Sequence, residues 1–147
     1  MVTIDINEYT HLSRVFFKGE YKDSKRLLLD IIKAAKYDIL IIDNYIDKSI
    51  IDFLNYREKK VFVKIITNPK NNNDLLFINE LKKNNPEIDI LISKDFHDRF
   101  IIIDNKYIYH CGSSINRIGY KTFAINKLND KVLINSFVKY IGEVIKK

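Results

Sequence analysis

Residues 37–43 read YDILIID, an apolar run of strand length that decides the fold. Four consecutive apolar residues, Ile39 to Ile42, leave this strand without a polar face. Such a strand is typical of the interior of a sheet that is covered on both sides. The run therefore predicts a sheet with helices on both faces, which is an α/β protein.

The segments around this strand alternate between helix and strand patterns. An apolar stripe predicts a helix at 22–36, with Asp23 or Ser24 as its cap. The expected elements are a strand at 13–19, the helices at 22–36 and 48–56, strands at 60–67 and 88–93, and a helix that Asp74 caps and that ends at Asn85-Pro86. This rhythm is typical of right-handed crossovers on a mostly parallel sheet.

The last third of the chain has a different pattern. Residues 99–112 predict two strands joined by a tight turn, and residues 121–126 predict another strand. A closing helix at about 130–146 is expected to cover one sheet face. The fold class is therefore α/β, with a mostly parallel mixed sheet, an antiparallel hairpin and helices on both faces. A chain of 147 residues has the size of one domain, which we place at 1–147.

Composition excludes several classes of protein. Cys111 is the single cysteine, so no internal disulfide can form, and the apolar stretches are far below the ~18 residues of a membrane span. The N-terminal residues carry acidic groups where a signal peptide needs an apolar run: Asp5, Glu8, Glu20 and Asp23. We expect a cytoplasmic protein with no membrane partner.

Positive charge gathers in the last third. Residues 1–100 hold 17 Lys and Arg against 16 Asp and Glu, whereas residues 101–147 hold 8 against 3. A basic region raises the local concentration of anions such as nucleic acid. An AT-rich coding bias would also enrich a chain in lysine, and charge alone does not separate the two explanations.

Residues 96–104, FHDRFIIID, contain the first candidate catalytic residues. Side chains alternate along a strand, so His97 and Arg99 are expected to project together, while Asp104 faces away and is given a structural role. An arginine fork binds two phosphate oxygens, and a nearby imidazole can attack phosphorus or exchange a proton. The alternative is a strand end with two solvated polar side chains.

Residues 111–119, CGSSINRIG, follow the second hairpin strand and predict a turn that opens a short helix. Gly112 permits close backbone approach, and free amides at a helix start attract anions. Ser113 and Ser114 offer hydroxyls, and Asn116 offers an amide donor. The alternative for the serines is an ordinary helix cap. The hairpin is expected to return this turn to the His97 end of the sheet.

A metal site is not expected. His110 and Cys111 are neighbours on a strand, so they point to opposite faces, and no second ligand pair has suitable spacing. The sequence predicts no cofactor.

Together, HDRFIIID and GSSIN resemble the phospholipase D superfamily motif, His-x-Lys-x4-Asp followed by Gly-Ser-x-Asn. The resemblance extends over nearly the whole chain and implies a phospholipase D-like domain. It implies that His97 acts as the nucleophile, without a metal ion, and forms a phosphohistidine intermediate. The family uses two motif copies and this chain holds one, so a homodimer is implied. The matching motif residues are His97 and Arg99 as catalytic groups, Ser113, Ser114 and Asn116 as phosphate ligands, and Asp104 and Gly112 as structural residues.

The chain departs from the family pattern at three points. Arg99 replaces the lysine, which keeps the charge but changes its geometry. Asn116 lies one position late, so Ser114 can take the part of the asparagine. Small nucleases of this type carry an acidic residue downstream of the motif, and this residue orients the histidine. In this chain the corresponding segment has Lys121 and Thr122 instead.

Three functions follow from these residues. The first is a metal-independent phosphodiesterase, a nuclease or nucleic-acid processing enzyme that acts on DNA or RNA. The second is a catalytically inactive nucleic-acid-binding module with a regulatory or host-defence role, such as bacterial defence. The third, a lipid-directed phosphodiesterase, lacks support because no amphipathic membrane-binding segment is evident.

Overall fold

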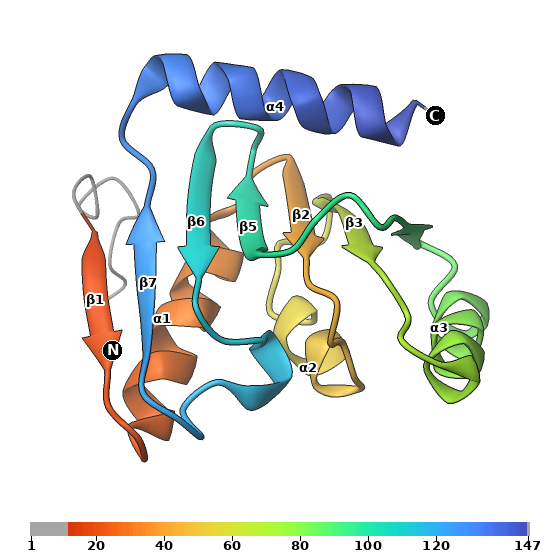
Figure 1. Cartoon of the computed structure of the whole chain (residues 1–147), viewed down its shortest axis with the longest axis horizontal. Coiled ribbons are helices and arrows are strands. Elements are labelled where there is room, and N and C mark those ends of the chain that lie inside the picture. The colour runs from red at the N-terminus through yellow and green to blue at the C-terminus, as the bar shows by residue number, and fades with distance from the viewer. Residues whose placement is uncertain (1–11, 147) are drawn as a thin grey trace.

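The chain folds into one twisted sheet between two layers of helices (Figure 1). The structure, a computed structural model, describes residues 12–146. The strands are β1 (Ser13–Phe16), β2 (Asp38–Ile42), β3 (Phe62–Thr67), β4 (Ile88–Ile92), β5 (Arg99–Ile103), β6 (Tyr107–Cys111) and β7 (Phe123–Lys127). The helices are α1 (Tyr21–Ala34), α2 (Ser49–Leu54), α3 (Asn72–Asn84), the 3₁₀ turn η2 (Ile115–Arg117) and α4 (Lys131–Ile145).

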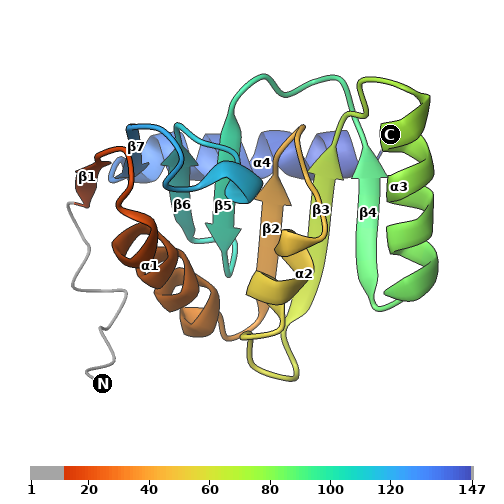
Figure 2. The same cartoon turned by 90° about the horizontal axis from the view of Figure 1, so that it is seen from below.

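The seven strands lie in the order β1-β7-β6-β5-β2-β3-β4 (Figure 2). The α/β class, the antiparallel hairpin and the helices on both faces are confirmed. The prediction of a mostly parallel sheet is wrong, because only β2–β3 and β3–β4 are parallel and the other four pairs are antiparallel.

The connections explain this difference. After β4, residues 93–98 cross to the far side of β2 and enter β5 from the edge at which β4 ended (Figure 2). A strand that starts at that edge must run against β2, since only a crossover to the opposite edge gives a parallel pair. The hairpin to β6 and the return to β7 repeat the reversal.

Strand β2 separates two hydrophobic clusters. Ile39 and Ile41 pack with α1, α2 and α3 on one face, while Leu40 and Ile42 pack with α4 on the other. Figure 2 shows α1 and α2 in front of the strands and α4 behind them. All four side chains are buried, and each contributes about 1.5–3 kcal/mol through its removal from water. The apolar run at 39–42 is thus buried on both faces, as its sequence predicts.

Two predicted helix caps are wrong. The N-cap of α1 is Glu20, and Ser24 is buried one turn later, where its hydroxyl donates to the Glu20 carbonyl at 2.7 Å. The N-cap of α3 is Asn71, whose side-chain oxygen accepts from the Asp74 amide at 2.9 Å. Ser24 lies on the core side of α1, and Glu20, the residue before the helix, occupies the N-cap position without a side-chain cap hydrogen bond.

The turn between β5 and β6 is tied to the start of β2. Asp104 and Asn105 both have positive φ, 56° and 52°, as in the turn type that matches the twist of a hairpin. The Asp104 carboxylate accepts from the amides of Tyr37 at 2.7 Å and Asp38 at 3.0 Å. This contact fixes β5 and β6 against β2, and so it sets the positions of residues at the opposite edge of the sheet.

Candidate active site

Three segments that are distant in sequence meet at one edge of the sheet. Because β5 runs against β2, and β6 against β5, the carboxyl ends of β2 and β6 lie at the same edge as the amino end of β5. The segments are Asp43 with Asn44 after β2, His97 to Arg99 at the start of β5, and Gly112 to Asn116 after β6. The topology therefore brings the two predicted motif segments to one edge.

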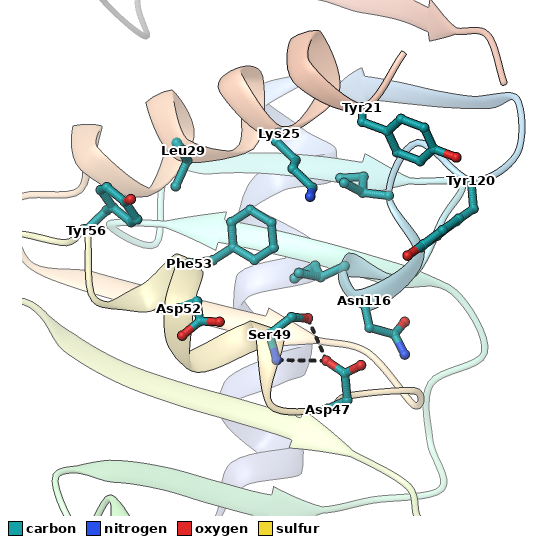
Figure 3. Close-up of a pocket in the computed structure, with 12 residues that line it drawn as sticks. Tyr21, Lys25, Leu29, Asp47, Ser49, Asp52, Phe53, Tyr56, Asn116 and Tyr120 are labelled. Atoms are coloured by element: carbon teal, nitrogen blue, oxygen red, sulfur yellow. Dashed lines mark hydrogen bonds between the residues drawn. The ribbon is translucent and has the colours of Figure 1, made fainter. Parts of the chain in front are cut away.

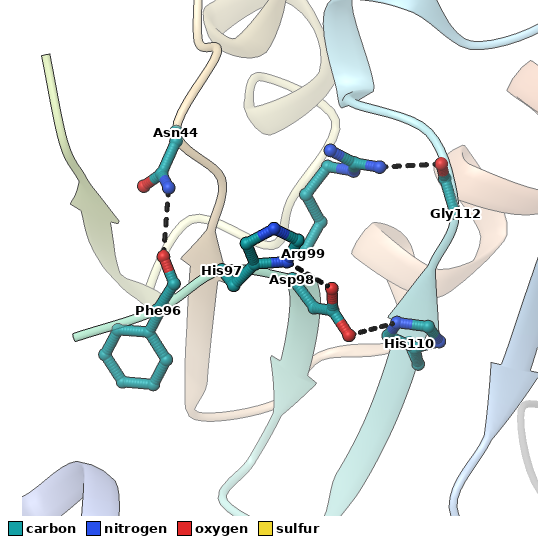
Figure 4. A network of polar contacts seen from close by, with 7 residues as sticks. All are labelled: Asn44, Phe96, His97, Asp98, Arg99, His110 and Gly112. Carbon is teal, nitrogen blue, oxygen red and sulfur yellow. Dashed lines mark hydrogen bonds and ion pairs between the residues drawn. The ribbon is translucent and has the colours of Figure 1, made fainter. Parts of the chain in front are cut away.

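His97 lies just before β5, and its side chain is fully exposed. Its Nδ1 is 3.1 Å from Oδ1 of Asp98 (Figure 4). The preceding loop is held by Asn44, whose side-chain amide donates to the Phe96 carbonyl at 3.0 Å. Since Nδ1 is engaged, Nε2 is the ring nitrogen that is open to a substrate.

Asp98 bridges two imidazoles. Its Oδ2 is 3.2 Å from Nε2 of His110 on β6. His110 is the residue that pairs with Phe100 in the hairpin. The hydrogen bond from His97 holds the pKa of Asp98 below its ordinary value, so Asp98 is a carboxylate at neutral pH. The motif gives Asp98 no role, and from the sequence His110 is considered only as a metal ligand. The hairpin register, with position 110 opposite position 100, is the signal that could have placed His110 near Asp98.

The Arg99 side chain extends toward the loop after β6, away from Asp98 (Figure 4). Its Nη2 donates to the Gly112 carbonyl at 2.7 Å, and its Nε is buried without a partner among residues 12–146. No described residue accepts a hydrogen bond from Nη1, which remains available to an anion. Gly112 approaches β7 closely, since a Cβ there would lie 3.1 Å from the Ala124 carbonyl oxygen. Arg99 and His97 thus share one edge but have separate partners.

A buried carboxylate anchors the turn after β6. Asp43 accepts from the Ser114 hydroxyl at 2.8 Å, the Ile115 amide at 3.0 Å and the Tyr45 amide at 2.9 Å. Burial raises the pKa of Asp43, while these hydrogen bonds and the charge of Arg99 oppose the shift. Asp43 is not among the predicted site residues, although its place directly after a buried strand is a signal for one.

The two serines are engaged within the chain. Ser114 is buried, and its single hydroxyl proton has two acceptors within reach, Asp43 and the Tyr45 carbonyl at 3.0 Å. The Ser113 hydroxyl donates to the Ser114 carbonyl at 3.0 Å. Ser114 is the N-cap residue of η2 but makes no side-chain cap hydrogen bond. The ordinary helix-cap explanation therefore does not account for either hydroxyl.

Asn116 lies in η2 between two hollows of about 440 and 250 Å³. Its Oδ1 is buried, and none of residues 12–146 donates a hydrogen bond to it. A buried polar atom without a partner is costly, which favours a ligand or a solvent contact at this amide.

No group of three or more His, Cys, Asp and Glu side chains within residues 12–146 is arranged to hold a metal ion. Cys111 is buried, and burial raises the pKa of its thiol to about 12, so the nucleophilic thiolate form is scarce at neutral pH. Among the helices of this same part of the chain, none has the length and apolar character to cross a membrane.

Comparison with known proteins gives structural matches alone. No family model matches the sequence, and no curated protein matches it. NucT from Helicobacter pylori superimposes with a TM-score of 0.69 at 15% identity, over 92% of this chain and 96% of NucT. Nuc from Salmonella typhimurium, a phospholipase D family member, gives 0.67 at 21% identity, over 90% and 93%.

A third structure is only partly covered. TrmBL2, an archaeal chromatin protein that shows a novel mode of DNA binding, gives a TM-score of 0.59 at 15% identity. The match covers 91% of this chain and 52% of TrmBL2. At these identities the likeness shows a shared fold.

Proposed function

Because the chain has the fold of the phospholipase D superfamily, we propose that it is a metal-independent phosphodiesterase that processes nucleic acid, with His97 as its nucleophile. The observation that carries this proposal is the orientation of the His97 imidazole. Its Nδ1 faces the Asp98 carboxylate at 3.1 Å, so the lone pair of Nε2 is directed to solvent at the sheet edge. This is the tautomer that nucleophilic attack needs.

The reaction has two steps. Nε2 of His97 attacks phosphorus, the bond from phosphorus to the leaving oxygen breaks, and a second imidazole donates a proton to that oxygen. Water then attacks the phosphohistidine, the P–N bond breaks, and the second imidazole takes the proton of the water. The sum is one diester and one water converted to a monoester and an alcohol, with both imidazoles restored.

The second imidazole comes from a second copy of the chain in this proposal. One motif is present, and the fully exposed side chain of His97 is accessible to a symmetry mate across a two-fold axis. A homodimer would place two His97 side chains around one phosphate.

The remaining edge residues hold the phosphate. Arg99 contributes Nη1 and a positive charge that stabilises the transition state, since Nη2 is already fixed on Gly112. Asn116 contributes its amide. Ser113 and Ser114 remain predicted phosphate ligands, and the Ser114 hydroxyl would have to leave Asp43 to act in that way.

Nucleic acid is the proposed substrate class, either DNA or RNA. Support comes from the basic last third of the chain, with 8 Lys and Arg against 3 Asp and Glu in residues 101–147. The similar fold of TrmBL2, which binds DNA, adds to this support.

One observation favours a second function, a nucleic-acid-binding module without turnover and with a regulatory or host-defence role. The Arg99 guanidinium is tied to the Gly112 carbonyl, and its Nε is buried. A guanidinium fixed in this way can bind an anion, but it cannot move with the phosphate as the phosphate changes geometry during a reaction.

The deciding experiment is incubation of the chain with end-labelled single- and double-stranded DNA and RNA in EDTA, beside a His97→Ala variant. We expect cleavage by the wild type and none by the variant. Cleavage that survives His97→Ala in an intact dimer contradicts the proposed mechanism. Retention of the oligonucleotide without cleavage by either protein supports the binding module.

A further inference from the structure

An aromatic groove adjoins the candidate active site. It lies between α1, α2 and the segment at 115–120, and it has a volume of about 440 Å³ (Figure 3). Asn116 lines this groove and also belongs to the turn at the active-site edge. The side chains that give the groove its character are Tyr21, Lys25, Phe53, Tyr56, Asn116 and Tyr120.

One end of the groove is built by a close approach of two distant segments. Gly119 has a φ of +88°, and a Cβ at this position would lie 2.8 Å from Cδ1 of Tyr21. Its carbonyl accepts from the Gly19 amide at 3.0 Å. The rings of Tyr21 and Tyr120 then meet edge to face, 5.4 Å apart. This end of the groove is therefore formed before any ligand arrives.

The groove leaves large aromatic surfaces in water. Tyr21, Tyr56 and Tyr120 are 41%, 55% and 52% exposed. Cations accompany them, because Lys25 points into the groove and the Arg117 guanidinium lies 5.7 Å from the centre of the Tyr120 ring. Exposed rings beside basic side chains are typical of surfaces on which nucleobases stack while the phosphates pair with the cations.

The acidic residues of the groove narrow the choice of ligand. Asp47 and Asp52 line the same hollow, and Asp47 also accepts from the Ser49 amide at 2.8 Å. Carboxylates repel a phosphate but accept hydrogen bonds from the exocyclic amino groups of bases. The groove therefore fits the base of a nucleotide better than its phosphate.

We propose that this groove binds an unpaired base of a single-stranded nucleic acid whose neighbouring phosphate lies at the active-site edge, so that the chain selects single strands over duplexes. The inference rests on the proposed function, because it takes nucleic acid as the ligand. A volume of about 440 Å³ is within the usual range of small-ligand sites. Bases in a duplex are paired and stacked on each other, so their faces cannot reach the tyrosines.

Binding measured in a His97→Ala background tests this inference without any need for catalysis. The probes are a fluorescein-labelled single-stranded oligonucleotide and a hairpin duplex of the same composition, followed by anisotropy at fixed salt. We expect the single strand to bind more tightly, and Tyr120→Ala to weaken it by roughly 5- to 100-fold, the usual loss for one stacked base. Tyr120→Phe keeps the ring and should bind like the parent.

Two further variants complete the test. Tyr37→Ala is the matched control, because Tyr37 is 68% exposed and directly precedes β2, at the opposite edge of the sheet. Tyr56→Ala alters the groove away from the Tyr21–Tyr120 contact and should also weaken the single strand. The inference is overturned if both groove variants bind like Tyr37→Ala, or if the duplex binds as tightly as the single strand. The proposed function is tested separately, by comparing cleavage by the wild type with cleavage by His97→Ala.

Discussion

The Asp98 carboxylate lies between two imidazoles, 3.1 Å from Nδ1 of His97 and 3.2 Å from Nε2 of His110. The phospholipase D motif implied an orienting acid downstream, where this chain has Lys121 and Thr122. A carboxylate adjacent to the histidine now faces the ring nitrogen that an orienting acid would contact. His110, on the neighbouring strand, holds that carboxylate from its other side.

Asp98→Asn is expected to lower kcat by about 100-fold or more while KM stays nearly unchanged. An amide at this position no longer selects the tautomer with a free Nε2, and Asp98 is not one of the proposed phosphate ligands. Steady-state kinetics on an oligonucleotide would measure both constants. Asp98→Glu should restore part of kcat, and Asp95→Asn, an exposed acid in the same loop, serves as the control. An equal loss from Asp95→Asn would point to a disturbed loop instead.

The stability contribution of Asp98 should depend on pH. The hydrogen bond from His97 lowers the pKa of Asp98 below 3.8, so the folded chain binds this proton less readily than the unfolded chain. The contribution is therefore present above pH 3.8 and is lost as the pH falls through the lower folded value. Thermal unfolding should show a higher Tm for wild type than for Asp98→Asn at pH 5, and the gap should narrow as the pH is lowered below 3.8. A gap that widens toward low pH would contradict the direction of the shift.

Arg99 substitutions separate the enzyme from the binding module. In the proposed reaction the guanidinium charge stabilises the transition state, so Arg99→Ala should lower kcat/KM by about 10²- to 10³-fold. Arg99→Lys keeps the charge and should stay within about tenfold of the wild type. If the wild type is inactive and Arg99→Lys cleaves, the fixed Arg99 guanidinium is the cause of inactivity, and the binding module is the native function.

The two serines should differ in their effect on stability. Ser114→Ala removes a buried donor from Asp43, and loss of such a buried partner costs about 1–3 kcal/mol of unfolding free energy. Ser113→Ala should cost less, because the Ser113 hydroxyl is only half-buried and bonds a neighbouring carbonyl. Urea unfolding of both variants would compare them. Equal stability combined with weaker phosphate binding in Ser114→Ala would support the phosphate-ligand role.

Cys111 should resist alkylation in the folded chain. Burial raises the pKa of its thiol to about 12, so the reactive thiolate is scarce at pH 8 and the sulfur is inaccessible. Iodoacetamide should label the native chain about 100-fold more slowly than the chain in guanidinium chloride, as measured by mass spectrometry. Rapid labelling of the native chain would show that β6 opens readily.

Local patterns in the sequence determined the elements of this protein. The apolar run at 39–42 predicts a strand buried on both faces, and the two apolar runs after Asp98 predict the β5–β6 hairpin; both are observed. These predictions work because side-chain periodicity records which faces are removed from water, and that information is local. The motif segments could be located for the same reason, since each is a short stretch at a strand end.

Only the tertiary structure decided the strand directions and the partners of the site residues. The direction of β5 depends on the edge at which residues 93–98 enter the sheet, and the apolar pattern of a strand is the same in both directions. Asp43 meets Ser114, and Tyr21 meets Tyr120, across long stretches of chain. Such pairs are fixed by strand order and by how closely two segments pack, which no local pattern in the sequence records.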